Sequence, residues 1–273
     1  MLTFSHVTKK FADFQLNIAD LVLRPGEICG LVGHNGAGKS TFLKMAAGLS
    51  TADSAEILLD GNRLISALQL REKIAFVPDR PALYDWMTVQ QFVSFLLSAG
   101  SIDPKKIGYA LDIFAVPLTK QIRNLSHGTR NKVGLAAALA RRGSFVLMDE
   151  PLSGLDMKSR DELLDQILQI AHDVSSSKGI LFSSHTVSDL EQIAQSVVII
   201  RQGSIVLTSS MEDIQTKWLV VKQCPPGLQR VYPLRQRGAI EFVVKEPDLN
   251  GMLAGISISR RATSLDVFLA VGS

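Results

Sequence analysis

The sequence predicts an α/β fold whose central parallel sheet is covered by helices on both faces. Two stretches of the chain carry this prediction. The first is an apolar run at 28–32 that ends in glycines and leads into a helical pattern over 40–49. The second is an alternation of short apolar runs with helically spaced stretches, in the order 145–148, 158–173, 180–182, 187–194 and 197–200. Fully apolar strands that alternate with helices are typical of a parallel sheet buried on both faces.

Three further stretches are expected to add to this core. Polar and apolar residues alternate over 2–23, which predicts an N-terminal antiparallel β-subdomain. The stretch of about 85–130 has helical spacing and predicts a helical subdomain. The tract 212–273 has short strand-like runs and a terminal amphipathic segment, which predict a small α+β appendage. We therefore expect a main domain over residues 1–211 and an appendage over 212–273.

Composition and charge narrow the class of protein. With 273 residues, 46% of them apolar, the chain can bury a substantial core. Its 29 basic and 26 acidic residues are interspersed and give a net charge of +3, so no basic block favours nucleic acid as a partner. Cys29 and Cys224 are too few for a disulfide framework, which fits a reducing cytoplasm. The apolar runs are shorter than the roughly 20 residues of a membrane-spanning helix, so we expect the chain itself not to cross a membrane.

A glycine-rich segment follows the apolar run at 28–32. Residues 33–40 read Gly-His-Asn-Gly-Ala-Gly-Lys-Ser and match the phosphate-loop pattern G-x-x-x-x-G-K-[ST] between a strand and a helix. The glycines let successive backbone N–H groups point inward, Lys39 supplies a charge for the β- and γ-phosphates, and Ser40 offers a hydroxyl to Mg²⁺. His34 occupies a free position of the pattern and is expected to be an ordinary loop residue. The residues expected to contact the nucleotide are Asn35, Gly36, Ala37, Gly38, Lys39, Ser40 and Thr41.

Two adjacent carboxylates, Asp149 and Glu150, follow the apolar run at 145–148. A strand end beside a phosphate loop is where a magnesium ligand and a base that activates water are needed. Taken alone, the pair fits a solvated strand end equally well. The choice between these interpretations depends on the segments that follow.

Several further segments occur in the order found in one family. Leu125-Ser126-His127-Gly128-Thr129 resembles the signature sequence LSGGQ of the ABC ATPases. Residues 153–156, Ser-Gly-Leu-Asp, match the D-loop of that family, and 183–185, Ser-Ser-His, match its switch-histidine segment. Each motif is short, but the ordered set is specific. Over roughly residues 1–215, the chain resembles the ABC ATPases, which implies a P-loop NTPase core that hydrolyses ATP with Mg²⁺.

The resemblance implies roles for individual side chains. Asp149 would hold Mg²⁺ through water, Glu150 would act as the general base toward the hydrolytic water, and His185 would contact the γ-phosphate. Phe11 stands where the family has an aromatic residue that stacks on adenine. A Phe in the core is the alternative interpretation for Phe11, and Phe14 competes for the same role.

The resemblance also implies partners. Ser126 and Gly128 would contact the γ-phosphate of ATP held by a second copy of the chain, and Asp156 would communicate across the same interface. Two copies, expected to form a homodimer, would close head to tail around two ATP molecules. They would drive a separate transmembrane permease from the cytoplasm, as a peripheral protein on the inner face of the cell membrane.

The chain departs from the family pattern at a few positions. His127 replaces a glycine of the signature and Thr129 replaces its glutamine. Asp79 stands in place of the Q-loop glutamine; its carboxylate can serve a magnesium-bound water but adds negative charge near the phosphates. The segments 78–85 and 264–269 resemble those of small exporter-type systems for antibiotics, peptides or ions, which predicts an exporter.

Two other classes of protein remain as alternatives. A soluble ABC-type ATPase that acts on the ribosome or on DNA would share the motifs. The translation-factor branch normally has two ATPase halves, however, and the DNA-repair branch has a long coiled coil between the phosphate loop and the acidic strand. This chain has one phosphate loop and no heptad run before Asp149. A GTPase or small-molecule kinase would share the phosphate loop but leave the segments at 125–129 and 153–156 unexplained.

Overall fold

The computed structural model describes most of the chain. It places residues 1–64, 66–172, 178–221, 232–236, 239–245 and 258–272. Cys224 lies outside the described residues, as do other parts of the tract 212–273.

Ten strands of the described residues form one large sheet. They are β1 (Leu2–Lys10), β2 (Gln15–Leu23), β3 (Ile28–Val32), β4 (Ser54–Leu59), β5 (Asn62–Arg63), β6 (Ile74–Val77), β7 (Phe145–Met148), β8 (Gly179–Ser184), β9 (Ser196–Arg201) and β10 (Ser204–Ser210). Their order across the sheet is β5-β4-β1-β2-β10-β9-β3-β8-β7-β6. The run from β9 to β6 is parallel, whereas β1, β2, β4 and β5 pair antiparallel. The predicted α/β class and the antiparallel N-terminal part are therefore confirmed.

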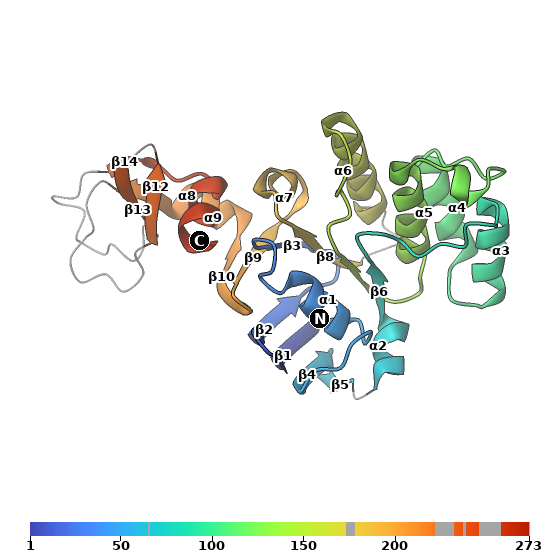
Figure 1. Cartoon of the computed structure of the whole chain (residues 1–273), viewed down its shortest axis with the longest axis horizontal. Coiled ribbons are helices and arrows are strands. Elements are labelled where there is room, and N and C mark those ends of the chain that lie inside the picture. Colours follow the sequence, from blue (N-terminus) through green and yellow to red (C-terminus); the bar gives the residue numbers. More distant parts are fainter. Residues whose placement is uncertain (65, 173–177, 222–231, 237–238, 246–257, 273) are drawn as a thin grey trace.

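Helices surround this sheet, and a second sheet lies at one end of the molecule. The helices are α1 (Lys39–Ala46), α2 (Ala67–Lys73), α3 (Val89–Ser98), α4 (Pro104–Ile113), η1 (Ile122–Asn124, a 3₁₀ turn), α5 (His127–Leu139), α6 (Met157–His172), α7 (Val187–Ile193), α8 (Met211–Lys217) and α9 (Ser264–Gly272). The second sheet contains β11 (Trp218–Val221), β12 (Tyr232–Gln236), β13 (Ala239–Lys245) and β14 (Ile258–Arg261). Figure 1 shows this sheet with α8 and α9 at one end of the long axis and α3, α4 and α5 at the other. In the part of the chain that the structure describes, every helix is too short or too polar to span a membrane.

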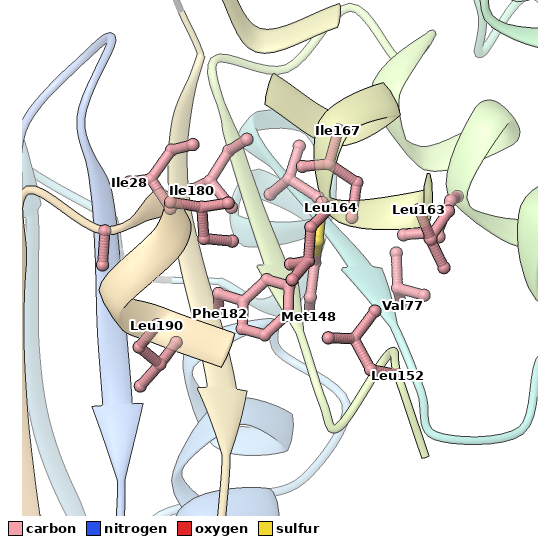
Figure 2. Packing of buried hydrophobic residues seen from close by; sticks show 14 of the residues in the cluster. Ile28, Val77, Met148, Leu152, Leu163, Leu164, Ile167, Ile180, Phe182 and Leu190 are labelled. Carbon is pink, nitrogen blue, oxygen red and sulfur yellow. The ribbon is translucent and has the colours of Figure 1, made fainter. Parts of the chain in front are cut away.

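Hydrophobic residues are packed on both faces of the parallel strands. On one face, side chains of β3, β6, β7 and β8 pack under α6 and α7 (Figure 2). The residues labelled there are Ile28, Val77, Met148, Leu152, Leu163, Leu164, Ile167, Ile180, Phe182 and Leu190. On the other face α1 packs against the N-terminal strands, where the rings of Phe42 and Phe4 meet edge to face with centroids 5.4 Å apart. Because helices pack on both faces of the sheet, the parallel strands are held in place and their carboxyl ends lie together at one edge of the sheet.

The structure departs from the predicted strand pattern near His6. Leu2 and Phe4 are buried, as the alternation predicts, but His6 is exposed with a φ of 51° and Val7 is buried instead. The register between β1 and β4 shifts between Ser5 and Thr8. An extra residue in one strand reverses the faces of the residues that follow, which is a β-bulge.

Two helix ends also differ from the predicted ranges. The helix after the phosphate loop ends at Ala46, earlier than the pattern over 40–49 predicts, because Gly48 adopts a left-handed φ of 68° that stops it. At the other end of the helical region, α5 continues to Leu139, beyond the predicted limit of about 130. The apolar side chains in the last turns of α5 belong to the hydrophobic core, and their burial stabilises the helix as far as Leu139.

The helix α9 begins with a network around one carboxylate. Asp266 is buried and accepts hydrogen bonds from the backbone N–H and the hydroxyl of Thr263, while its own N–H donates to that hydroxyl. Arg260 forms an ion pair with the same carboxylate. Burial alone would raise the pKa of Asp266, but hydrogen bonds from Arg260 and Thr263 lower it to about 2. The reciprocal bonds of Thr263 and Asp266 resemble a capping box, which starts the helix.

This network predicts a pH-dependent contribution to stability. A carboxyl group whose pKa is lower in the folded than in the unfolded state stabilises the fold above the unfolded value, and the contribution is lost as the pH falls through about 4 toward about 2. Asp266→Asn should therefore lower the free energy of unfolding by about 1–3 kcal/mol near neutral pH. In urea titrations at several pH values, the difference from the wild type should shrink as the pH is lowered. Asp161→Asn, at an exposed position of α6, is the control, and a deficit in Asp266→Asn that does not change with pH would contradict this account.

Candidate nucleotide site

The candidate site lies at the carboxyl edge of three neighbouring parallel strands. β8 pairs with β3 on one side and with β7 on the other. The glycine-rich segment follows β3, the two adjacent carboxylates follow β7, and the segment 183–185 ends β8. Because parallel strands place their carboxyl ends at the same edge, segments far apart in the sequence meet here.

Two glycines of the loop at 33–38, Gly33 and Gly38, lie in close contact with their surroundings. A Cβ on Gly33 would lie 2.6 Å from the carbonyl oxygen of Ile200, and a Cβ on Gly38 would lie 2.7 Å from Leu16. Gly38 also has a φ of 105°, a conformation that L side chains rarely adopt. The loop then enters α1 at Lys39, so the free N–H groups of a helix start face the same space.

Three candidate catalytic side chains form a continuous chain of contacts. Lys39 is 6% exposed; its Nζ donates to the carbonyl oxygen of Gly33 at 2.7 Å and lies 3.2 Å from Oε1 of Glu150. The other carboxylate oxygen of Glu150 is 2.7 Å from Nδ1 of His185. The structure thus brings together Lys39, Glu150 and His185, although the sequence places Lys39 more than a hundred residues before the other two. A carboxylate next to an imidazole and an ammonium group is suited to moving a proton at a phosphate.

The backbone at Glu150 is held in a conformation unusual for its residue type. Its φ is 47°, in the left-handed region. The N–H of Glu150 donates to the Ser183 hydroxyl at 2.9 Å, and its carbonyl oxygen accepts from the N–H of Ser153 at 2.9 Å. Such strain persists only where surrounding contacts enforce it, and it is found preferentially at functional sites.

Asp149 and Ser40 form the pair that suits a magnesium ion. Oδ1 of Asp149 accepts hydrogen bonds from the hydroxyls of Ser40 and Ser183, each at 3.0 Å. Burial raises the pKa of the Asp149 carboxyl, although these two hydroxyls oppose the effect. Nowhere in the described residues do three or more His, Cys, Asp or Glu side chains gather to hold a metal ion. A magnesium ion at this place would therefore take most of its oxygen ligands from phosphates and water.

A pocket of about 450 Å³ encloses these groups. The residues that line it are Phe14, His34, Asn35, Gly36, Ala37, Gly38, Lys39, Ser40, Thr41, Asp79, Asp149, Glu150, Ser153 and His185. An adjoining pocket of about 570 Å³ extends along Phe14, the loop and residues 200–202. The two together offer room for phosphates at one end and for a base at the other.

The aromatic side chain in this pocket is Phe14. Phe11, the residue expected from the resemblance, is 44% exposed and does not appear in the lining of either pocket. Its ring lies next to that of Phe14, with centroids 6.0 Å apart. Phe14, named above as a competitor for the adenine contact, lines both pockets, and the exposed ring of Phe11 lies beside it. The assignment of Phe11 to the adenine stays a prediction. Asp79 is half-buried and lies where the sequence predicts, in the lining of the pocket.

Besides Phe11, three of the predicted site residues lie outside the pocket lining. The hydroxyl of Ser126 caps α5 by accepting from the N–H of Thr129 at 3.2 Å, and Gly128 follows in the first turn. Asp156 is exposed and accepts from the N–H and the hydroxyl of Ser159, at 3.0 and 2.8 Å. The backbone hydrogen bond from Ser159 lowers the pKa of Asp156. Within one chain, these residues start helices and do not reach the loop at 33–38.

One neighbour of the loop was missed by sequence reasoning. The ring of His34, taken above for an ordinary loop residue, packs against Phe268 of α9 with ring centroids 5.2 Å apart. Phe268 is 6% exposed, and α9 also packs against α7, the helix that follows His185. The amphipathic pattern at 265–271 shows that Phe268 faces a partner, but no local signal identifies His34 as that partner.

Comparison with known proteins places the chain in a family. The ABC transporter family matches residues 16–153. The ABC transporter ATP-binding protein YxlF of Bacillus subtilis is 33% identical over 195 residues, which are 69% of this chain and 63% of YxlF. The probable sulfate/thiosulfate import ATP-binding protein CysA of Chlorella vulgaris is 31% identical over 220 residues, 78% of this chain and 92% of CysA. This chain thus spans less than two thirds of YxlF but nearly all of that CysA.

A solved structure agrees with the sequence relatives. The structure of an ATP-binding subunit of an ABC transporter covers 79% of this chain and 92% of its own length, with a TM-score of 0.68 and 26% identity. The family match, the relatives and the solved structure agree on the family. The chain therefore belongs to the ABC transporter family, of which it is an ATP-binding ATPase domain.

Proposed function

We propose that the chain is the ATP-hydrolysing subunit of an ABC transporter and that hydrolysis occurs in the pocket at the carboxyl edge of β3, β7 and β8. The observation that carries this proposal is the chain of contacts from Lys39 through Glu150 to His185, beside the Asp149 and Ser40 pair. Lys39 and the loop amides bind the phosphates. Glu150 takes the proton of the attacking water, and His185 orients Glu150 and contacts the γ-phosphate.

The same proposal includes Mg²⁺ as the partner of the phosphates. Ser40 and Asp149 would hold it, and Asp79, in the same lining, would contact its water shell. When bound, the ion neutralises charge on the phosphate oxygens. The hydroxyls of Ser40 and Ser183 hold the Asp149 carboxylate in place for this contact.

A second copy of the chain would complete the site. Ser126 and Gly128 at the start of α5, and Asp156 before α6, lie outside the pocket of their own chain, and Ser126 and Asp156 are exposed to solvent. A helix start that presents a hydroxyl and free N–H groups suits the γ-phosphate of ATP. We therefore propose a head-to-tail homodimer in which each start of α5 faces the phosphate loop of the other copy.

Glu150→Gln tests the catalytic role and the dimer together. The amide keeps the size of the side chain and can still hydrogen-bond to its neighbours, but it cannot take a proton. We expect turnover to fall at least about a hundredfold, while ATP binding is retained and a dimer accumulates with ATP. Phosphate release and size-exclusion chromatography with and without ATP are the measurements. Glu162→Gln, at an exposed position of α6, is the control; turnover in Glu150→Gln equal to that of the control would exclude Glu150 as the base.

The permease would dock on a groove between the main sheet and the helical subdomain. A pocket of about 390 Å³ lies there, lined by residues of β6, of the loop that follows Asp79, and of α5. The lining as a whole, to which α3 and the turn after it also contribute, includes Pro78, Pro81, Ala82, Leu83, Leu96, Ser101, Ile102, Gly134, Ala137, Ala138 and Arg141. The lining is largely apolar, which suits a short helix from a cytoplasmic loop of the permease. Its position between Asp79 and α5 connects the groove with both the phosphates and the signature segment.

Ala82→Glu tests this docking surface. Ala82 is exposed and lines the groove, so we expect the substitution to leave the fold intact but to place a charge in a largely apolar contact with the permease. We expect the ATPase activity of the isolated chain to be unchanged and the amount that co-purifies with membranes to fall at least about tenfold. Val22→Glu on β2 is the control for added charge. Membrane recovery of Ala82→Glu equal to that of the control would place the permease elsewhere.

The proposal includes a direction of transport, which is export. The segments 78–85 and 264–269 support an exporter, and this stays a prediction. One relative, CysA of Chlorella vulgaris, is named for sulfate and thiosulfate import. The membrane protein that co-purifies with the chain decides the matter: a permease that works with a solute-binding protein would contradict the exporter assignment.

We also propose that residues 212–273 are an appendage to a main domain of residues 1–211 and that the appendage supports the phosphate loop. The contact of Phe268 with His34 supports this role. The carbonyl oxygen of His34 accepts from the N–H of Ala37 at 3.1 Å and from Nζ of Lys39 at 3.5 Å. Fixing His34 therefore helps to fix the loop and the lysine that bind the phosphates.

Phe268→Ala tests the support of the phosphate loop. Removing the ring frees His34, so we expect ATP affinity to fall about three- to tenfold, a loss of about 1 kcal/mol, as for other aromatic contacts. Titration with a fluorescent ATP analogue measures the affinity, and thermal unfolding shows whether the variant is folded. Leu265→Ala, at an exposed position of α9, is the control. A folded Phe268→Ala protein with wild-type ATP affinity would limit Phe268 to a packing role.

A further inference from the structure

The histidine in the signature segment contacts another loop of the same chain. His127 occupies the first position of α5, and its Nε2 lies 3.2 Å from the carbonyl oxygen of Ser153. Ser153 is the last residue of the turn 150–153 and is itself in the lining of the nucleotide pocket. A residue that departs from the family signature therefore touches the rim of the site in its own chain.

The partners of His127 decide which ring nitrogen carries the proton. A carbonyl oxygen only accepts, so Nε2 must carry a hydrogen to bond Ser153. The amide of Asn131, which is 2% exposed, also lies at Nε2, with its nitrogen 3.4 Å away. Among the described residues the Oδ1 of Asn131 has no hydrogen-bond partner. Turning the amide by half a turn would bring Oδ1, in place of the nitrogen, to the Nε2–H as a second acceptor beside the Ser153 carbonyl; such amide orientations are assigned from the hydrogen-bond network.

Ser153, which His127 contacts, is hydrogen-bonded to the candidate base Glu150. The N–H of Ser153 donates to the carbonyl oxygen of Glu150, whose backbone is in the left-handed conformation. On the other side, the N–H of Glu150 is held by the hydroxyl of Ser183. The turn 150–153 is thus fixed from β8 by Ser183 and from α5 by His127. The left-handed backbone conformation of Glu150 is unfavourable for an L residue, so the turn depends on these two contacts to keep it.

Neighbouring residues bring the two segments into close packing. A Cβ on Gly154 would lie 3.4 Å from the ring of His127, and a Cβ on Gly128 would lie 3.1 Å from Leu155. The signature segment and the D-loop therefore fit against each other over several residues. The imidazole supplies the polar contact in this fit, which a glycine at the same position has no side chain to make.

We propose that His127 is a positioning residue that holds the turn 150–153 from α5 and thereby aims the Glu150 carboxylate at the attacking water. The inference rests on the proposed role of Glu150. It explains why a bulky side chain is accommodated in the signature segment of this chain. The imidazole links the segment that faces the second copy with the base of its own copy.

Substitutions at His127 in the full chain test the proposal. His127→Gly restores the glycine of the family signature but removes the donor, so we expect kcat for ATP hydrolysis to fall about three- to tenfold, while KM for ATP changes by less than about twofold. His127→Gln keeps an N–H that can reach the Ser153 carbonyl, and it should retain a kcat near that of the wild type. Lys132→Ala, on the same helix and outside this network, is the control.

Backbone hydrogen exchange supplies a readout that is independent of turnover. In nucleotide-free protein, the Ser153 amide should exchange faster in His127→Gly than in the wild type, because its bond to Glu150 loses support. In His127→Gln its protection should be retained. Equal protection in all three proteins would overturn the proposal. So would an unchanged kcat in His127→Gly, or a His127→Gln protein as impaired as the glycine variant.

Glu150→Gln separates this inference from the proposed function. If Glu150→Gln turns over ATP at the wild-type rate, the role of Glu150 is wrong and the positioning role falls with it. If Glu150→Gln is inactive but His127→Gly is fully active, only the positioning role is wrong. A loss of activity in both, with kcat recovered in His127→Gln, supports both.

Discussion

The placement of β8 between β3 and β7 is the constraint on which the rest of the site depends. It sets the Ser183 hydroxyl between two residues of the neighbouring strand end, where it donates to Asp149 and accepts from the backbone of Glu150. Without these bonds, two adjacent carboxylates would face each other at a partly buried edge, which is costly. The hydroxyls of Ser40 and Ser183 stabilise the Asp149 carboxylate, and the Lys39 ammonium stabilises that of Glu150, so both carboxylates can lie at this edge.

The features predicted from the sequence are those that a short stretch determines by itself. The apolar runs of the parallel strands, the glycine loop and the acidic pair each carry a local pattern, and the structure places them at one edge as the α/β class predicts. The bulge at His6 escaped the prediction because His6 was counted in the alternation with Leu2 and Phe4. The next apolar residue is Val7, one position later than the period requires, and this is the local sign of the inserted residue. The end of α1 depended on Gly48, whose left-handed backbone conformation is visible only in the structure.

The contacts between distant segments could not be predicted from the sequence. Phe14 lines the pocket and Phe11 is exposed beside it, because the two rings leave the turn between β1 and β2 differently; a period of alternating residues does not show this. The bond of His127 to Ser153 joins two motifs that sequence reasoning treated separately. The resemblance located His127 as a departure from the signature, but its partner depends on how α5 packs beside the loop after β7.

The position of Phe268 has a consequence for how the protein is made. The phosphate loop leaves the ribosome early, whereas α9 is synthesised much later. Because chains begin to fold from the N-terminal end during synthesis, the main sheet and its loop form while the ring that covers His34 is still to be added. For that interval one face of the loop is open to water. During synthesis, the phosphate loop therefore gains its contact with α9 in a late step, after the sheet that carries the loop has folded.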